Sequence, residues 1–207
     1  MYFKVAKKNF YNALSVAARA ISTFSPLPAF SGIKIDAKED CLVLTGSDSD
    51  VSIQTKLVKS EDCNLEIRDM GSIVIEAKYI LEIVRKINAD EIEFEVIDGC
   101  STKISGNTAE FRINGMRANE YPAIDFSKPK ECFTMEEDIL RRIILQTSFA
   151  TSDKETRPVL TGVNFACDGT TLNCVATDSY RLAKKTIEIK ESLNFNIFTG
   201  GCKDIGR

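Results

Sequence analysis

The sequence predicts an α+β fold built from repeated units, each made of a strand, a helix and three further strands. Three observations predict it. Strand, helix and turn signals recur at a constant offset in a long repeat, which aligns Gly32 with Gly162. A weaker short repeat aligns Val5 with Ile75. Within each copy, the apolar residues change between the alternation typical of strands and the period of about 3.6 residues typical of helices. We therefore expect domains that each consist of two βαβββ halves.

The long repeat is clearest around two glycines and two aspartates. Gly32 and Gly162 each begin an alternating stretch, and Asp48 and Asp178 each follow a second one, with the same offset in both pairs. The offset continues towards the N-terminus without a gap through Pro28 and Pro158, Leu14 and Ile144, Phe10 and Leu140, and Phe3 and Phe133. A spacing shared over so long a stretch indicates one fold that is used twice.

The short repeat aligns residues 5–14 with 75–84 and predicts two amphipathic helices in the first domain. The apolar face of the first helix carries Phe10, Leu14, Ala17 and Ile21, and that of the second carries Ile80, Ile83, Val84 and Ile87. Strands are expected to follow at about 32–37, 41–46 and 51–58, and again at 91–97, 101–105 and 109–114.

A stretch with two prolines, from Tyr121-Pro122 to Lys128-Pro129-Lys130, predicts a linker, because proline excludes a continuing helix. We expect a first domain at 1–126 and a second domain at 131–207. The long repeat places the second helix of the second domain at the last residues of the sequence. The second domain is therefore expected to be incomplete, with its first half only.

The composition excludes several classes of function. The chain has no histidine, which removes Ser-His-Asp and Cys-His nucleophilic sites and histidine-ligated metal sites. Its seven cysteines form no CxxC pair, which argues against a disulfide framework and a zinc site, and no cofactor is expected. The formal net charge is −3, so affinity for nucleic acid requires a local basic face. Without a signal peptide or a membrane-length apolar run, a soluble cytoplasmic protein is expected.

Basic residues lie opposite the apolar faces of both predicted helices. The first helix carries Lys8 and Arg19, and the second carries Lys78 and Arg85 together with Glu82. On their own, such stripes are typical of solvated helix faces.

Two groups of segments resemble a known family. Residues 27–32 and 42–48 resemble the first-domain signature of bacterial sliding clamps, the beta subunits of DNA polymerase III. Residues 176–183, with Arg157 and 160–162 upstream, resemble the second-domain signature. The resemblance runs from residue 1 to about 195 and indicates an N-terminal fragment with the first domain and part of the second. It implies clamp-type domains with helices on one face of antiparallel sheets, which the full-length protein assembles into a homodimeric ring.

The resemblance implies a non-catalytic processivity factor of a DNA polymerase holoenzyme, grouped with the DNA-directed DNA polymerases as a nucleotidyltransferase. It would encircle duplex DNA without sequence preference, because lysine and arginine contact phosphates. The implied DNA contacts are Lys8, Arg19, Lys78, Arg85 and Lys154. Phe24 stands where clamps usually carry a basic residue, so that contact is expected to be lost or replaced.

The resemblance also implies a peptide site, where the replicative polymerase, the clamp loader and repair polymerases dock short linear motifs. One wall of this site would be formed by Leu160, Thr177, Ser179, Tyr180, Arg181 and Leu182. The opposite wall would belong to sequence beyond residue 207. Asp178 is interpreted as a turn residue, because Asp48 repeats it in a domain without a peptide site.

Two other classes of function remain open. One is a repeat scaffold that binds only protein, and the other is an enzyme that uses Asp48, Asp50 or Asp178 as acid or base. A single carboxylate without a partner of separated pKa is a weak signal for catalysis. Salt-sensitive retention of DNA separates a clamp from a scaffold, and turnover assays separate both from an enzyme.

Overall fold

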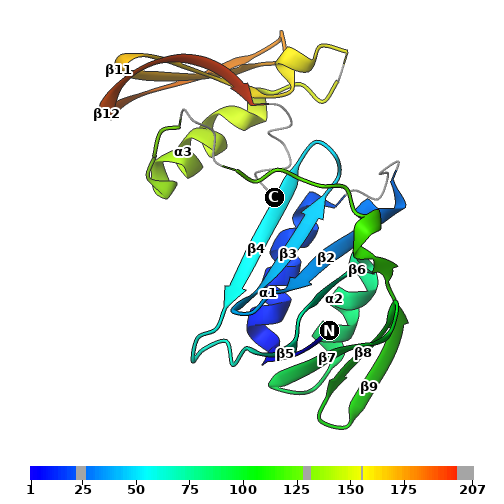
Figure 1. The fold of residues 1–207 in the computed structure, drawn as a ribbon. Helices are drawn as coiled ribbons and strands as arrows, with labels where there is room; N and C mark the ends of the chain where they lie inside the picture. The colour runs from blue at the N-terminus through cyan, green and yellow to red at the C-terminus, as the bar shows by residue number, and fades with distance from the viewer. Residues whose placement is uncertain (22–26, 128–131, 155, 200–207) are drawn as a thin grey trace. The chain divides into compact units, whose positions relative to one another are not determined.

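The computed structural model describes residues 1–21, 27–127, 132–154 and 156–199. The chain divides into two compact units, unit 1 at Met1–Phe126 and unit 2 at Ser127–Arg207 (Figure 1). Among the described helices, none is both long and apolar enough to cross a membrane. The six cysteines in the described residues are free thiols, and Cys202 lies outside those residues.

Unit 1 contains two halves with the same order of elements. The first half has β1 (Tyr2–Ala6), α1 (Lys7–Ala17), β2 (Gly32–Ala37), β3 (Cys41–Ser47), β4 (Ser52–Val58) and β5 (Glu66–Asp69). The second has β6 (Gly71–Glu76), α2 (Ala77–Lys86), β7 (Glu91–Asp98), β8 (Ser101–Gly106), β9 (Ala109–Asn114) and β10 (Met116–Arg117). The six expected strands are confirmed to within one residue at each end. The short strands β5 and β10 were not expected, because neither has a clear alternation.

The two halves of unit 1 exchange their first strands. Sheet 1 has the order β5-β1-β7-β8-β9, and sheet 2 has the order β10-β6-β2-β3-β4. Strand β1 of the first half therefore pairs with β7 of the second, and β6 of the second half pairs with β2 of the first. Both of these pairs are antiparallel. The exchange explains why both copies of the short repeat belong to one domain, since neither half completes a sheet alone.

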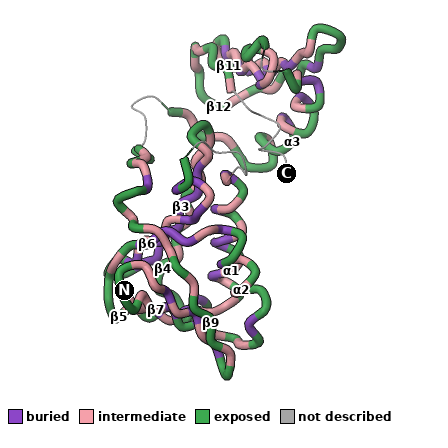
Figure 2. The backbone as a smooth tube through the Cα atoms, turned by 90° about the vertical axis from the view of Figure 1, so that its right-hand side faces the viewer, coloured by how far each residue is buried: buried purple, intermediate pink, exposed green. Residues whose placement is uncertain are grey.

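One buried cluster joins both helices to both sheets (Figure 2). Phe3 stacks on Phe94 with ring centroids 4.8 Å apart, and Phe10 of α1 meets both rings edge-on. Burial of a side chain of this size stabilises the fold by about 2–3 kcal/mol. Most of the predicted apolar faces are buried, but Ile83 is only partly buried. Ile21 is also partly buried and lies beyond the end of α1.

Gly46 marks a close approach between β3 and the end of α1. A Cβ atom at this position would lie 2.1 Å from the carbonyl oxygen of Ala17, closer than any real contact. The residue that the long repeat aligns with Gly46 in unit 2 is Ala176, which is buried. The two units therefore differ in how closely the helix approaches this strand.

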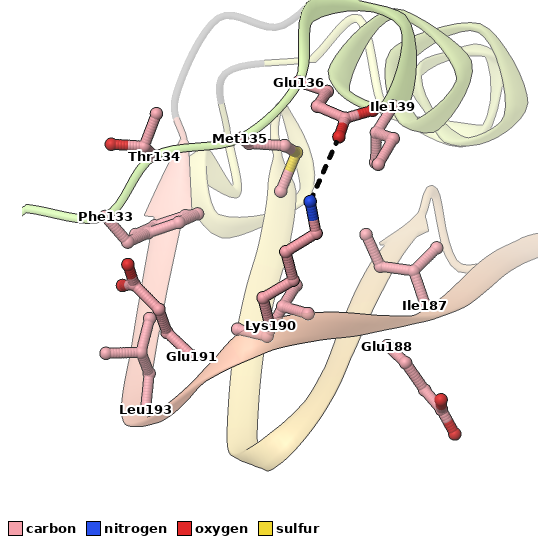
Figure 3. A pocket seen from close by; sticks show the side chains of 11 residues that line it. Phe133, Thr134, Met135, Glu136, Ile139, Ile187, Glu188, Lys190, Glu191 and Leu193 are labelled. Atoms are coloured by element: carbon pink, nitrogen blue, oxygen red, sulfur yellow. Dashed lines mark ion pairs between the residues drawn. The ribbon is translucent and has the colours of Figure 1, made fainter.

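Unit 2 contains α3 (Glu137–Thr147), β11 (Val163–Thr177) and β12 (Leu182–Thr199). Helix α3 begins and ends where the long repeat expects it from α1, and the short 3₁₀ helix at Ser148–Ala150 repeats the one at Ala18–Ala20. Strands β11 and β12 pair antiparallel, with a register shift between Gly169 and Thr171. Both strands turn sharply partway along (Figure 3). Gly169 has a φ of 62°, which glycine adopts without steric cost.

The two glycines of the long repeat occupy equivalent places. Gly32 begins β2, and Gly162 directly precedes β11. A Cβ atom would lie 3.0 Å from the carbonyl oxygen of Ile75 at Gly32, and 1.5 Å from that of Thr199 at Gly162. Each glycine therefore lets a neighbouring strand approach closely, and their equivalent positions agree with the long repeat.

Burial does not follow the repeat along the third helix. Phe10 and Leu14 are fully buried, whereas Leu140 is 41% exposed and Ile144 is partly exposed. In unit 1 the face of α1 is covered by α2 and by both sheets, but α3 packs mainly on β11, β12 and the adjoining 3₁₀ helix. The 131–207 extent of the second domain stays a prediction.

Candidate DNA face and peptide site

The four predicted DNA contacts of unit 1 are all at least partly exposed. Lys8 and Lys78 occupy the second position of α1 and α2, which the short repeat aligns. Lys8 and Arg85 line one hollow of about 420 Å³, together with Tyr11, Asn12 and Asn88. Arg19 lies beyond α1 in the 3₁₀ helix Ala18–Ala20, and neither Arg19 nor Lys78 lines this hollow. The structure thus brings two of the four side chains together.

These cations differ in how far they are compensated. Arg85 lies 3.8 Å from the carboxylate of Glu82 on the same helix. Lys8, Arg19 and Lys78 make no ion pair with any described residue. An exposed ion pair such as Arg85–Glu82 contributes at most about 1 kcal/mol, so Arg85 keeps most of its capacity to attract an anion.

Lys7 is a structural residue that the sequence pattern did not single out. Its ammonium group donates hydrogen bonds to the main-chain carbonyl oxygens of Arg85 and Ile87, where α2 ends. A cation at this end of a helix complements the helix dipole and satisfies carbonyl groups without intrahelical partners. The contact ties the start of α1 to the end of α2 and so places Lys8 beside Arg85. The sequence shows no sign of this structural role, because Lys7 differs in no visible way from its neighbour Lys8.

Acidic residues gather on the opposite side of sheet 1. In β7, Ile92 and Phe94 point into the core, so the alternating side chains of Glu91, Glu93 and Glu95 face away from it. Lys4 compensates Glu91 at 2.6 Å. The outer face of sheet 1 therefore carries both signs, because Lys103 and Arg112 on the neighbouring strands β8 and β9 pair with Glu110.

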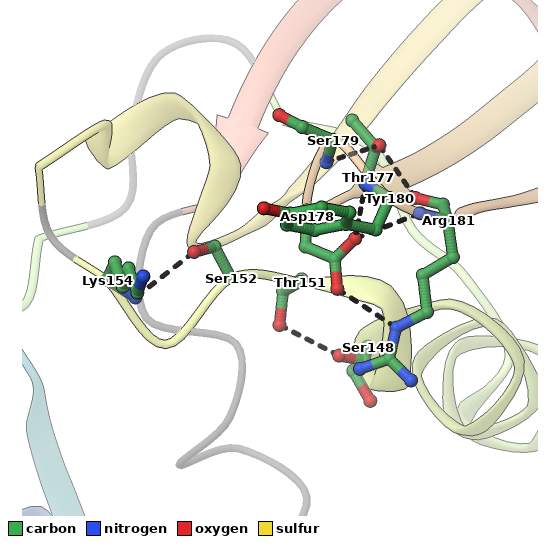
Figure 4. Close-up of polar contacts among 9 residues, drawn as sticks. All are labelled: Ser148, Thr151, Ser152, Lys154, Thr177, Asp178, Ser179, Tyr180 and Arg181. Atoms are coloured by element: carbon green, nitrogen blue, oxygen red, sulfur yellow. Dashed lines mark hydrogen bonds and ion pairs between the residues drawn. The ribbon is translucent and has the colours of Figure 1, made fainter.

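In unit 2, Lys154 lies on an exposed loop, where its main-chain N–H donates to the hydroxyl of Ser152 over 3.1 Å (Figure 4). Its ammonium group makes no ion pair with a described residue. Phe24 lies outside the described residues, so the expected loss of a DNA contact there stays a prediction.

The turn between β11 and β12 is built by the aspartate that the sequence assigned to it. Asp178 Oδ1 accepts hydrogen bonds from the main-chain N–H groups of Tyr180 at 2.9 Å and Arg181 at 3.0 Å. The hydroxyl of Thr177 donates to the carbonyl oxygen of Arg181 and accepts from the N–H of Ser179. The N–H groups of Tyr180 and Arg181, and then the guanidinium group of Arg181, hold the pKa of Asp178 below its usual value.

Arg181 is held from two sides. Its Nε lies 3.0 Å from Asp178 Oδ2 (Figure 4). Its Cζ lies 5.9 Å from the ring centroid of Phe149. Phe149 is 57% exposed and was not among the predicted site residues. Nothing in its sequence context distinguishes it from an ordinary helix-end residue, because its contact depends on a turn far along the chain.

The apolar members of the predicted peptide site differ in exposure. Tyr180 is 97% exposed and Leu182 is 65% exposed, while Leu160 is partly buried. The carbonyl oxygen of Leu160 accepts a hydrogen bond from the N–H of Ser152 over 2.8 Å, which anchors the segment that carries it. Tyr180 and Leu182 therefore offer exposed apolar side chains on either side of Arg181 in the chain.

A separate hollow of about 340 Å³ in unit 2 contains none of the predicted peptide-site residues. It lies between the segment before α3 and strand β12, and its apolar lining includes Phe133, Met135, Ile139, Ile187 and Leu193. Lys190 closes one side by an ion pair with Glu136 at 3.6 Å (Figure 3).

Comparison with known proteins decides the family. The model of the DNA polymerase III beta subunit, N-terminal domain, matches residues 1–125, and the model of the central domain of the same subunit matches residues 134–198. The chain belongs to the DNA polymerase III beta-subunit family. This confirms the resemblance noted in the sequence.

Individual beta subunits agree with this assignment. The chain is 40% identical to the beta sliding clamp of Halalkalibacterium halodurans over 93% of this chain and 51% of that protein. It is 38% identical to the clamp of Bacillus subtilis over 97% of this chain and 54% of that protein. The chain thus spans about half the length of these relatives.

Solved beta-subunit structures show the same fold. The Bacillus subtilis sliding clamp superposes with a TM-score of 0.94 at 35% identity, over 100% of this chain and 56% of that chain. The beta chain from Streptococcus pneumoniae gives a TM-score of 0.94 at 30% identity, over 99% and 56% respectively. The α+β clamp fold expected from the sequence is confirmed.

Proposed function

We propose that this chain is part of a DNA sliding clamp, a processivity factor that tethers the replicative polymerase to duplex DNA by encircling it. The observation that carries the proposal is the pair of cations Lys8 and Lys78, which stand at equivalent positions of two neighbouring helices in a beta-subunit fold. Arg19 and Arg85 add charge to the same two helical segments. Encirclement makes the attachment topological, so no sequence-specific contact is required.

The proposed contacts suit movement along DNA. Lysine and arginine on flexible stems bind phosphates through charge, and phosphates carry no sequence information. Lys154 of unit 2 extends this set.

A second proposed activity is the docking of partners through short linear motifs at Leu160, Thr177, Ser179, Tyr180, Arg181 and Leu182. An exposed tyrosine and an exposed leucine give a peptide apolar contact area, and the arginine gives directed N–H donors. The proposed partners are the replicative polymerase, the clamp loader and repair polymerases. The longer protein is proposed to form a homodimeric ring in the cytoplasm, where chromosomes are replicated.

The proposed role is non-catalytic and requires no cofactor, because tethering involves no bond making or breaking. The test compares retention on closed circular DNA at increasing salt for the full-length protein and for variants with Lys8 and Lys78 changed to alanine. A clamp should stay on circular DNA, leave after linearisation, and load less well when the lysines are removed. Binding of partner peptides without any retention on DNA would instead favour the scaffold.

A further inference from the structure

Three residue pairs in this chain place an exposed aspartate or asparagine directly before a glycine: Asp98-Gly99, Asn114-Gly115 and Asp168-Gly169. In such a pair the main-chain nitrogen of the glycine can attack the carbonyl carbon of the preceding side chain, because glycine has no Cβ atom to hinder the approach. The attack closes a succinimide ring. Since all three side chains are exposed, exposure does not distinguish the pairs. The hydrogen bonding of the glycine N–H group does.

The N–H group of Gly99 lies in an exposed turn. Gly99 and Cys100 connect β7 to β8, and Asp98 pairs with Ser101 across this turn. The N–H group of Gly99 donates to no acceptor among the described residues. A Cβ atom at Gly99 would meet no heavy atom within 4 Å, so the space around it is open. The nitrogen can therefore approach the carboxyl group of Asp98 without first leaving an acceptor in the described part of the chain.

The N–H groups of the other two glycines are engaged. Gly115 donates to the main-chain carbonyl oxygen of Cys100 over 2.8 Å, and Gly169 donates to Oδ1 of Asn194 over 3.2 Å. Gly115 is also tightly packed, since a Cβ atom there would lie 2.7 Å from the carbonyl oxygen of Val74. Each N–H group must leave its acceptor before the nitrogen can attack. A hydrogen bond of typical net strength slows such a step by about fivefold.

We propose that Asp98-Gly99 is a site of spontaneous isoaspartate formation in the folded protein, and that the glycine hydrogen bonds protect Asn114 and Asp168. The nitrogen of Gly99 forms a bond to Cγ of Asp98, and the N–H hydrogen leaves with the carboxyl hydroxyl group as water. Water then adds to the main-chain carbonyl carbon of the succinimide and breaks its bond to nitrogen. The chain now continues through Cγ, and the former main-chain carbonyl carbon becomes a carboxyl group. No oxidant or cofactor takes part.

Isoaspartate changes the turn in which it forms, because it adds a methylene group to the main chain. The connection between β7 and β8 consists only of Gly99 and Cys100, and the length of so short a turn sets the register of its strands. The added group therefore disturbs the pairing of Asp98 with Ser101. Modification of this turn loosens the end of the β7–β8 hairpin while the buried side chains of β7, Ile92 and Phe94, stay at the other end of the strand.

The test incubates the protein at neutral pH in buffer and, in parallel, in guanidinium chloride, which unfolds it. Isoaspartate is counted at each site by tryptic peptide mapping with electron-transfer fragmentation, which distinguishes isoaspartate from aspartate. The ratio of the unfolded rate to the folded rate at one site removes the intrinsic difference between aspartate and asparagine. We expect this ratio to be close to one at Asp98 and at least about fivefold larger at Asn114 and Asp168.

A pair of variants tests the protecting hydrogen bond directly. Asn194→Ala removes the acceptor of the Gly169 N–H group at an exposed position and should speed isoaspartate formation at Asp168 in the folded protein by about fivefold. The matched control is Asn196→Ala, at an exposed position of the same strand whose side chain contacts Asn164 instead, and it should leave that rate unchanged. Similar ratios of unfolded to folded rate at the three sites would overturn the proposal. An unchanged rate at Asp168 in Asn194→Ala would overturn it as well.

Discussion

Ser49 and Ser179, which the long repeat aligns, both adopt a positive φ, of 89° and 78°. Each directly follows the aspartate whose Oδ1 accepts two main-chain N–H groups of its turn. For an L-residue this region of backbone space costs roughly 1–2 kcal/mol. The same strain in both copies indicates that the aspartate hydrogen bonds determine the turn and that the serine accommodates it.

Substitution at Ser179 should reveal this strain. We expect Ser179→Gly to raise the free energy of unfolding by about 0.5 kcal/mol, because relief of strain exceeds the entropy cost of glycine. Ser179→Val should lower it by about 1–2 kcal/mol, since a β-branched side chain tolerates positive φ poorly. Urea denaturation followed by circular dichroism measures both, with the same pair at Ser49 as a parallel. A valine variant as stable as wild type would contradict the argument.

Lys7 should matter for stability and Lys8 should not. Lys7→Met keeps most of the apolar stem but removes the hydrogen bonds to the end of α2, so we expect a loss of about 1–2 kcal/mol in the free energy of unfolding. Lys8→Met, on the adjacent exposed position, should change it by less than about 0.5 kcal/mol. Urea denaturation of the two variants provides the comparison, and equal losses would show that the carbonyl contacts of Lys7 contribute nothing.

If the basic helix face binds DNA, the loss of affinity on substitution should depend on which basic residue is removed and not on the sequence of the DNA. Replacing Lys8 and Arg85 by alanine should weaken binding to duplexes of unrelated sequence by the same factor. It should also reduce the slope of log affinity against log salt by roughly one unit per lost contact. Fluorescence anisotropy at several salt concentrations measures both quantities.

The matched control for this experiment is Lys56, which is exposed in β4. Its neighbours Thr55 and Leu57 line a hollow beside α1, so the alternation of the strand turns Lys56 to the other face of sheet 2. Lys56→Ala removes the same charge and should leave the salt slope unchanged. A loss of affinity that differs between duplex sequences would contradict a sliding role.

Much of the fold could be predicted from the sequence because its signals are local. The six strands of unit 1 and the equivalence of α1 and α3 follow from periodicity and a constant spacing. The exchange of β1 and β6 between halves could not be predicted, because strand pairing depends on contacts between residues far apart in the chain. The sequence also did not show that α3 is less buried than α1, because a helix face is apolar whether or not another element covers it.

In the candidate site, too, local contacts could be predicted from the sequence and long-range contacts could not. Asp178 was assigned to its turn correctly, because the acceptor and its two donors are close neighbours in the chain. Phe149 and Lys7 were missed, because one acts through a distant turn and the other through the end of a different helix. Single charged or aromatic residues carry no periodicity from which such long-range contacts can be inferred.

The depressed pKa of Asp178 has a consequence for pH dependence. Because its folded pKa is below the unfolded value of about 3.9, the ionised carboxylate stabilises the folded turn above that value, and this contribution is lost as pH falls through the folded pKa. The turn N–H groups are the main cause and the Arg181 side chain a smaller one. Arg181→Met should therefore raise the pKa only in part, as ¹³C NMR of the side-chain carboxyl would show. Full return to the ordinary value would mean that the arginine is the main cause.

The last prediction concerns the length of chain needed for peptide docking. Among the predicted site residues Tyr180 and Leu182 are exposed, and this chain spans about half the length of its relatives. A peptide on a single wall leaves much of its apolar area in water and recovers less of the cost of association. We therefore expect a partner peptide to bind the full-length protein at least about tenfold more tightly than the 207-residue chain, a difference of about 1.4 kcal/mol. Titration calorimetry on both proteins measures it. Equal affinities would place the binding surface entirely within residues 1–207, and weaker binding by the longer protein would argue against the proposed second wall.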